Sequence, residues 1–446
     1  MEFIPNSSMK NTMLKEMNLS TINDLFNDIP KKILINHLDI ADGKNQQETE
    51  HHLRSIGKKN KSMYDMPCFL GGGSKPHYIA AAVKSIISRS EFFSAYTPYQ
   101  PEASQGFLQA MFEYQSLIAE ITEMDISNAS LYDGATALGE AALMCYRLTK
   151  KSTFLIPKNI SKEKKSVLRN YTIGLKMKIK EINYDSESGS IDINHLKKNM
   201  DSDVAGIYIE NPNYFGIFEK DCEQISLLTQ KHNSLFVVGV DPISLGIAKA
   251  PGSYSADIVI GEGKCFGNPV DFGGSTLGIF ACKKQHIRQI PGRIIGLTND
   301  TDNNKAFCMT LQTREQHIRR GRATSNICTN EGLNALAATV HLSLLGGKGL
   351  QSLARINFEK AQYLSKQIQS IPGFKKPFTA VHFNEFVITC IDAKKIYKQL
   401  LKKGIQAGYL LENESSELKN MMLFGVTEMH TKDSIEQLLS ALRQVK

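Results

Sequence analysis

Residues 203–240, DVAGIYIENPNYFGIFEKDCEQISLLTQKHNSLFVVGV, decide the fold. An apolar run over 203–209 predicts a buried strand, residues 219–233 predict a helix, and a second apolar run over 235–240 predicts another strand. A helical crossover brings the chain back to the same end of a sheet, so the two strands are expected to be parallel.

The same alternation extends to both sides of this segment. Further helices are expected at 161–171 and 192–200, and further strands at 153–157, 176–182, 256–260 and 275–281. Strands alternating with helices at this spacing predict an α/β fold whose mostly parallel sheet is covered on both faces.

The pattern divides the chain into three predicted parts. Residues 1–65, with a helix expected at 9–27, read as an N-terminal helical arm, and residues 66–330 as the large α/β domain. Residues 331–446 read as a smaller C-terminal α/β domain, in which a long helix at 349–371 links it to the large one.

Composition excludes several classes of protein. Of 446 residues, 41% are hydrophobic and 22% charged, which argues against disorder and collagen. The net charge of +8 is spread along the chain and no basic run alternates with aromatic residues, so we expect no nucleic acid partner. Neither a membrane-length apolar stretch nor a signal core occurs, and the eight cysteines show no CxxC spacing. We therefore expect a cytoplasmic protein with reduced thiols and no metal site.

The segment LYDGATA at 131–137 precedes a helix expected at 135–148. Gly134 and the Thr136 hydroxyl lie at the start of that helix, where free N–H groups and the helix dipole can bind a phosphate. The alternative is a plain helix cap, in which Asp133 or Thr136 satisfies the same N–H groups.

Two charged residues follow strands of the predicted sheet. Asp241 ends the strand at 235–240, and Lys264 comes shortly after the strand at 256–260. A carboxylate at this edge can pair with a protonated ring nitrogen, and a lysine in a closed site can form a Schiff base. A phosphate-binding helix start, an aspartate and a lysine in this order suggest a pyridoxal phosphate site. The alternatives are a turn aspartate and a surface lysine.

Two more segments carry candidate residues. Arg319 and Arg320 belong to a basic cluster over 314–322, which could clamp anionic groups or form a charged interface. Tyr96 and Tyr99 lie in YTPYQP, where two prolines hold a turn that could line a pocket or a subunit contact.

Long segments over essentially the whole chain match one known family in a single register. They are PCFLGGG (67–73), ISRSEFFSAYTPYQPEASQG (87–106), NASLYDGATALGEAALMCYR (128–147), NPNYFG (211–216), DPISLG (241–246), ADIVIGEG (256–263), QIPGRIIG (289–296) and TREQHIRRGRATSNICTNEGLNALAA (313–338). On these segments the chain resembles the N-terminal subunit of glycine dehydrogenase (decarboxylating), the P-protein family of the glycine cleavage system.

The resemblance implies a pyridoxal-phosphate fold of the aspartate aminotransferase type, fold type I. It also implies an α2β2 assembly in which the C-terminal subunit binds the pyridoxal phosphate, glycine is decarboxylated, and the aminomethyl group passes to the lipoyl arm of the H protein. This chain would then be the non-cofactor-binding copy. Tyr96, Tyr99, Arg319 and Arg320 are its candidate substrate-rim or interface residues.

The chain departs from the family at one important position. Cofactor-binding subunits carry a His-Lys pair where this sequence has Gly263-Lys264, and N-terminal subunits usually carry glutamine at the position of Lys264. Lys264 is therefore a candidate vestigial Schiff-base position, with Gly134, Thr136 and Asp241 as candidate cofactor contacts. Two alternatives stay open: a self-sufficient pyridoxal phosphate decarboxylase using Lys264, and a purely structural scaffold subunit.

Overall fold

The computed structural model describes residues 7–35, 37–73, 75–95, 98 and 100–445. Contacts divide the chain into two units, Met1–Lys61 and Ser62–Lys446, and each is described by itself. In the predicted three-part division, the boundary at 330/331 stays a prediction.

The first unit contains short helices: η1 (Ser7–Met9), α1 (Lys10–Glu16), η2 (Ile22–Phe26) and α2 (Gln46–Gly57). The continuous helix expected at 9–27 is wrong, because Asn18 adopts a left-handed φ of 57° and separates α1 from η2. Asn45 and Glu48 form a capping box at the start of α2. Leu14 is the one buried side chain among the described residues of this unit.

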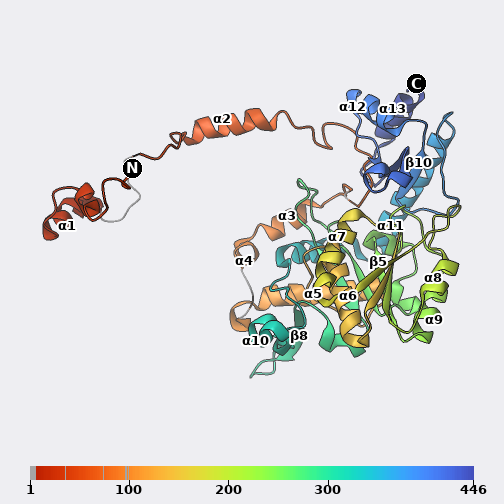
Figure 1. Ribbon diagram of the computed structural model, residues 1–446, viewed down its shortest axis with the longest axis horizontal. Helices are drawn as coiled ribbons and strands as arrows, with labels where there is room; N and C mark the ends of the chain where they lie inside the picture. Colours follow the sequence, from red (N-terminus) through yellow and green to blue (C-terminus); the bar gives the residue numbers. More distant parts are fainter. Residues whose placement is uncertain (1–6, 36, 74, 96–97, 99, 446) are drawn as a thin grey trace. The chain divides into compact units, whose positions relative to one another are not determined.

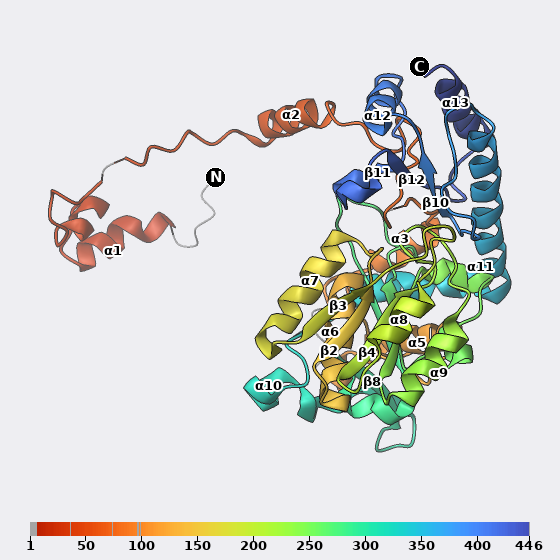
Figure 2. The same ribbon diagram turned by 45° about the vertical axis from the view of Figure 1, so that its right-hand side comes forward.

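The second unit is built on a seven-stranded sheet of order β1-β7-β6-β5-β4-β2-β3 (Figures 1 and 2). Its strands are β1 (Ile126–Ser127), β2 (Thr153–Pro157), β3 (Lys178–Ile182), β4 (Val204–Glu210), β5 (Leu235–Val240), β6 (Ile258–Glu262) and β7 (Gly278–Cys282). Strands β2 to β6 are parallel, whereas β7 is antiparallel to β6 and β1 to β7. The predicted mostly parallel sheet is confirmed.

Helices cover both faces of this sheet. Those of the second unit are α3 (Ala81–Ile87), α4 (Ser90–Phe93), α5 (Gln105–Thr122), α6 (Gly134–Thr149), α7 (Lys162–Thr172), α8 (Ile193–Asn199), α9 (Cys222–Lys231), α10 (Gln316–Arg319), α11 (Gly332–Gln369), α12 (Ala393–Lys402) and α13 (Lys432–Arg443). Tyr208 packs with α6 and α7, while its neighbours Ile207 and Ile209 pack with α5, α8, α9 and α11 on the other face. This alternation explains why the strands read as continuous apolar runs.

A three-stranded antiparallel sheet forms the second core. Its order is β10-β12-β11, with β10 (Glu385–Thr389), β12 (Met421–Gly425) and β11 (Tyr409–Leu410). Phe386 and Phe424 pack there with Leu364 and Ile368 of α11 and with Phe69 from the other end of the unit. The smaller C-terminal α/β sheet is thus present as predicted.

Further details bear on the predicted elements. The sequence predicts one helix at 331–345 and another at 349–371, and the two segments of α11 on either side of Gly346 (φ 59°, ψ 179°) confirm both. The polar stretch near 298–305 is the turn of a hairpin, β8 (Ile294–Asn299) with β9 (Lys305–Thr310), which was not predicted. In the described residues, no helix has the length and apolar character needed to cross a membrane.

Candidate functional site

The candidate site lies at the carboxyl ends of β5 and β6, beside the start of α6. Asp241 follows β5, and Glu262 and Lys264 stand at the end of β6. Asp133, Gly134 and the following residues begin α6, whose N-terminus points its free N–H groups toward this edge. The topology therefore brings Gly134, Asp241 and Lys264 to one edge of the sheet, as the sequence predicts.

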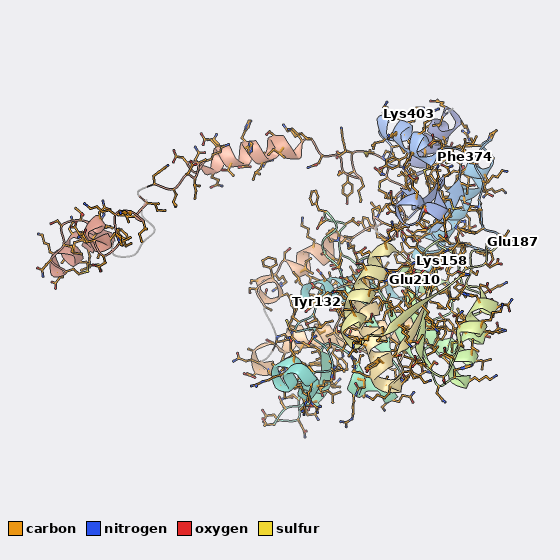
Figure 3. The ribbon with its side chains drawn as sticks, in the orientation of Figure 1. Tyr132, Lys158, Glu187, Glu210, Phe374 and Lys403 are labelled. Atoms are coloured by element: carbon orange, nitrogen blue, oxygen red, sulfur yellow. The ribbon has the colours of Figure 1, made fainter. Side chains whose placement is uncertain are left out.

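The start of α6 is closed by a capping box. The Asp133 carboxylate accepts a hydrogen bond from the Thr136 backbone N–H (2.7 Å), and the Thr136 hydroxyl oxygen accepts one from the Asp133 N–H (3.2 Å). The plain-cap arrangement considered for this segment is therefore present, and Thr136 is engaged within it. Tyr132, labelled in Figure 3, precedes the cap, and its hydroxyl accepts a hydrogen bond from the Cys328 N–H (3.3 Å).

Glu262 brings a carboxylate to the same helix start. Its Oε2 accepts a hydrogen bond from the Gly134 N–H (3.1 Å), and its Oε1 accepts from the Lys264 N–H (3.0 Å) and the Leu277 N–H (2.9 Å). Burial raises the pKa of Glu262, and these three N–H groups together with the Lys264 charge counteract part of that rise. Sequence reasoning did not name Glu262 as a site residue, although its place two residues before Lys264 was a usable signal.

Lys264 is buried, with 8% of its surface exposed. It follows Gly263 at the end of β6, and its charge acts on the Glu262 carboxyl. The alternative of a surface lysine is therefore wrong for this position.

Asp241 pairs with a lysine that the sequence did not single out. Asp241 Oδ2 lies 3.5 Å from Lys75 Nζ, which lies 3.2 Å from Glu385 Oε2. Asp241 Oδ1 also accepts a hydrogen bond from the Ile243 N–H (3.1 Å), as expected for a turn aspartate. Burial alone would lower the pKa of Lys75, but the Glu385 and Asp241 charges outweigh burial and raise it.

Glu385 is held by the glycine run as well as by Lys75. Its Oε1 accepts hydrogen bonds from the Gly72 N–H (2.6 Å) and the Gly73 N–H (3.1 Å). Gly72 and Gly73 have φ of 93° and 99°, a left-handed conformation that glycine adopts without strain. The GGG segment is thus a small anion-binding loop whose anion is a carboxylate of the chain itself.

The Glu428 carboxylate forms a second set of contacts in this region. Glu428 Oε2 lies 3.0 Å from His77 Nδ1 and accepts a hydrogen bond from Asn357 Nδ2 (3.1 Å), and Glu428 Oε1 accepts from the Tyr78 N–H (2.7 Å). Cys265 lies among the charges of this region, and burial raises the pKa of its thiol. A thiol of raised pKa is a poor nucleophile, so Cys265 is a packing residue.

The residues at this edge do not fit pyridoxal phosphate. That cofactor needs free N–H groups for its phosphate and a free carboxylate for its protonated ring nitrogen. The Gly134 N–H is taken by Glu262, the Thr136 N–H by Asp133, and Asp241 by Lys75. Among the described residues, no group of three or more His, Cys, Asp or Glu side chains is placed to hold a metal ion.

The arginine candidates lie elsewhere. Arg319 ends α10 and Arg320 begins the next turn, and both residues are exposed. Helix α10 lies at the end of the second unit opposite the small sheet (Figures 1 and 2). Arg314 is buried and donates hydrogen bonds to the carbonyls of Ile290 and Gly292 (2.7 Å for the second), so it supports this segment. Tyr96 and Tyr99 lie outside the described residues.

Comparison with known proteins gives a consistent result along the whole chain. A family model described as glycine cleavage system P-protein matches residues 1–442. The probable glycine dehydrogenase (decarboxylating) subunit 1 of Thermococcus onnurineus is 46% identical over 446 residues, which cover 99% of each chain. Its counterpart from Saccharolobus solfataricus is 46% identical over 449 residues, covering 99% of this chain and 97% of that protein.

Comparison with solved structures supports the same family and fold. A crystal structure of glycine decarboxylase (P-protein) of the glycine cleavage system, in inhibitor-bound form, has a TM-score of 0.89 at 35% identity and covers 100% of both chains. A C-DES mutant with glycine covalently linked to its PLP cofactor has a TM-score of 0.64 at 12% identity, covering 86% of this chain and 98% of that one, a likeness of fold alone. The predicted fold type I architecture is confirmed.

Proposed function

This chain belongs to the glycine cleavage system P-protein family, as a subunit 1 of glycine dehydrogenase (decarboxylating), and we propose that it serves glycine decarboxylation without holding the pyridoxal phosphate itself. In this proposal a separate C-terminal P-protein subunit binds the cofactor, and the two form an α2β2 assembly. The aminomethyl group left after decarboxylation passes to the lipoyl arm of the H protein.

One observation carries the proposal: the edge of the sheet that would hold a cofactor is occupied by internal contacts. The Gly134 N–H donates to Glu262, and Asp241 faces the Lys75 ammonium at 3.5 Å. An enzyme that used Lys264 for a Schiff base would need both anchors free. This supports a partner-assisted function over the self-sufficient decarboxylase.

We further propose that this chain supplies residues at the rim of the partner's pocket. Arg319 and Arg320 are exposed, and neither takes part in the contacts around Asp241. Exposed guanidinium groups suit the carboxylate of glycine or an acidic carrier protein, to which the net charge of +8 is also complementary. Tyr96 and Tyr99 complete the proposed rim.

The cofactor assignment is tested on the isolated full-length chain. The chain is mixed with pyridoxal phosphate, reduced with borohydride and mapped by mass spectrometry, with a separately purified pyridoxal-binding P-protein subunit as positive control. We expect label on the control and none on Lys264. Label on Lys264 with a visible absorption band would overturn the proposal and favour the self-sufficient enzyme.

The rim assignment is tested in the reconstituted complex. Arg319→Ala and Arg320→Ala are compared with Arg288→Ala, an exposed arginine in the turn Lys284–Gln289. Losing one charge-assisted hydrogen bond to an anion should lower kcat/KM for glycine decarboxylation about tenfold in the first two variants and leave the third unchanged. Unchanged rates in all three, with the complex still assembled, would favour the scaffold alternative.

A further inference from the structure

Charged side chains of this chain contact the two groups that a bound cofactor would need, the start of α6 and the Asp241 carboxylate. We infer that Glu262 and Lys75 are built-in substitutes, Glu262 for a phosphate at the start of α6 and Lys75 for a ring cation beside Asp241. The inference rests on the proposed function and adds the means by which the cofactor is excluded. Removing both substitutes should then restore pyridoxal phosphate binding.

Glu262 occupies the anion position fully. A helix N-terminus attracts anions, and the carboxylate meets the first N–H of α6 at 3.1 Å while two more N–H groups hold it from the other side. Gly134 also packs closely against the end of β6, where a Cβ would lie 3.3 Å from Gly261 O and from Glu262 N. A phosphate could bind there only after the Glu262 side chain is displaced.

Lys75 occupies the cation position. Lys75 is 8% exposed, and its ammonium lies 3.5 Å from Asp241 Oδ2 and 3.2 Å from Glu385 Oε2. A buried ammonium is costly unless it is paired, and the partly buried carboxylates of Asp241 and Glu385 repel each other unless a cation lies between them. The three charges therefore stabilise one another, and a ring cation would have to replace Lys75 to reach Asp241.

Lys75 also connects two sheets. Asp241 follows β5 of the large sheet, and Glu385 begins β10 of the small sheet. The ammonium thus links the two sheets at this edge. Replacing Lys75 frees the Asp241 carboxylate, and replacing Glu262 frees the Gly134 N–H at the start of α6, so both changes are needed for a cofactor to bind.

The test is a gain of binding in the full-length chain. Lys75→Met/Glu262→Ala is titrated with pyridoxal phosphate and followed by visible absorbance and by borohydride trapping. The matched control is Lys283→Met/Glu140→Ala, which removes a lysine paired with Asp257 and a buried carboxylate paired with Ser325. We expect the first variant to bind at least about tenfold more tightly than the control and the wild type, because freed N–H groups bind an anion through charge-assisted hydrogen bonds.

The outcomes separate this inference from the proposed function. Label on Lys264 in the wild type would overturn the proposed function. A folded double variant that binds no better than the control, with an unlabelled wild type, would overturn the substitution inference alone. Adding Lys264→Ala to the binding variant should abolish trapping, and persistent trapping would place the reactive amine elsewhere and overturn the restored site.

Two measurements keep the test decisive should the alanine variant fail to fold. Lys75→Met/Glu262→Gln preserves side-chain size and should also gain phosphate-dependent binding, since its neutral amide competes less well than a carboxylate. In the wild type, the N–H groups of Gly134, Lys264 and Leu277 should exchange slowly with deuterium whether or not inorganic phosphate is present. Fast exchange that phosphate suppresses would show an open anion site and overturn the inference.

Discussion

Replacing Glu428 by glutamine is expected to remove a large part of the stability of the second unit near neutral pH. The carboxylate of Glu428 is 13% exposed and receives hydrogen bonds from Tyr78 and Asn357 beside its 3.0 Å contact with His77. Burial alone would raise its pKa, but the hydrogen bond and charge of His77 and the Tyr78 N–H outweigh burial and lower the pKa from 4.5 to about 2.

The magnitude follows from linkage. A pKa that falls from 4.5 in the unfolded chain to about 2 in the folded chain corresponds to roughly 3 kcal/mol of stability. Because the folded value is the lower one, this stabilisation is complete above about pH 5 and is lost as the pH falls toward 2. The variant should therefore be about 3 kcal/mol less stable at pH 7 and should match the wild type near pH 2.

The assay is urea unfolding between pH 2 and pH 7, followed by circular dichroism and tyrosine emission because the chain has no tryptophan. Glu359→Gln, an exposed residue on α11, is the control. The other titratable groups whose charges act near Glu428, namely His77, Cys265, His341, Lys360 and His430, are present in both proteins. A difference that stays constant with pH, or that is absent at pH 7, would refute the reasoning.

Three further outcomes are expected. Burial raises the pKa of Glu219 to about 7, so the wild type should lose roughly 3 kcal/mol of stability as the pH rises from about 4.5 through 7. Urea unfolding of Glu219→Gln should show less of this loss, and parallel pH profiles of the two proteins would contradict the prediction. Gly216 has φ 81°, and a Cβ there would lie 1.9 Å from Glu385 O, so Gly216→Ala should lower stability by more than about 3 kcal/mol. Gly174→Ala, with open space around it, should not, and equal melting midpoints of the two variants in a thermal scan would contradict the steric argument. Arg314→Ala leaves two backbone carbonyls without their guanidinium donor and should cost about 2–4 kcal/mol by urea unfolding, and a wild-type midpoint would show that water replaces the arginine fully.

The large sheet was predictable because its strands are buried on both faces and separated by helices. Residues 203–240 show this directly, since β4, α9 and β5 coincide closely with the predicted segments. The antiparallel direction of β7 was not predicted, although the segment 263–277 contains no crossover helix and so returns the chain in the opposite direction. Strand β1 has two residues, which is too short for any periodic pattern.

The candidate site was predictable only in part. Asp241 and Lys264 could be placed together because each follows a predictable strand of one sheet, and Gly134 could be placed at the start of a predictable helix. The charged groups that contact Asp241 could not be predicted, because Lys75 and Glu385 are separated by most of the chain and meet only through the packing of the small sheet. Sequence spacing carries no information on such long-range charge pairs.

The interrupted helix α11 has a consequence for how the second unit folds. Beyond Gly346, the same helix contributes Leu350 and Ala354 to the core of the large sheet and Leu364 to the core of the small sheet. Neither core can be completed without this helix, so the two are thermodynamically coupled and should melt in one cooperative transition. An isolated small-sheet fragment would lose Phe69 and the support of the large sheet, and it would not be an independent folding unit.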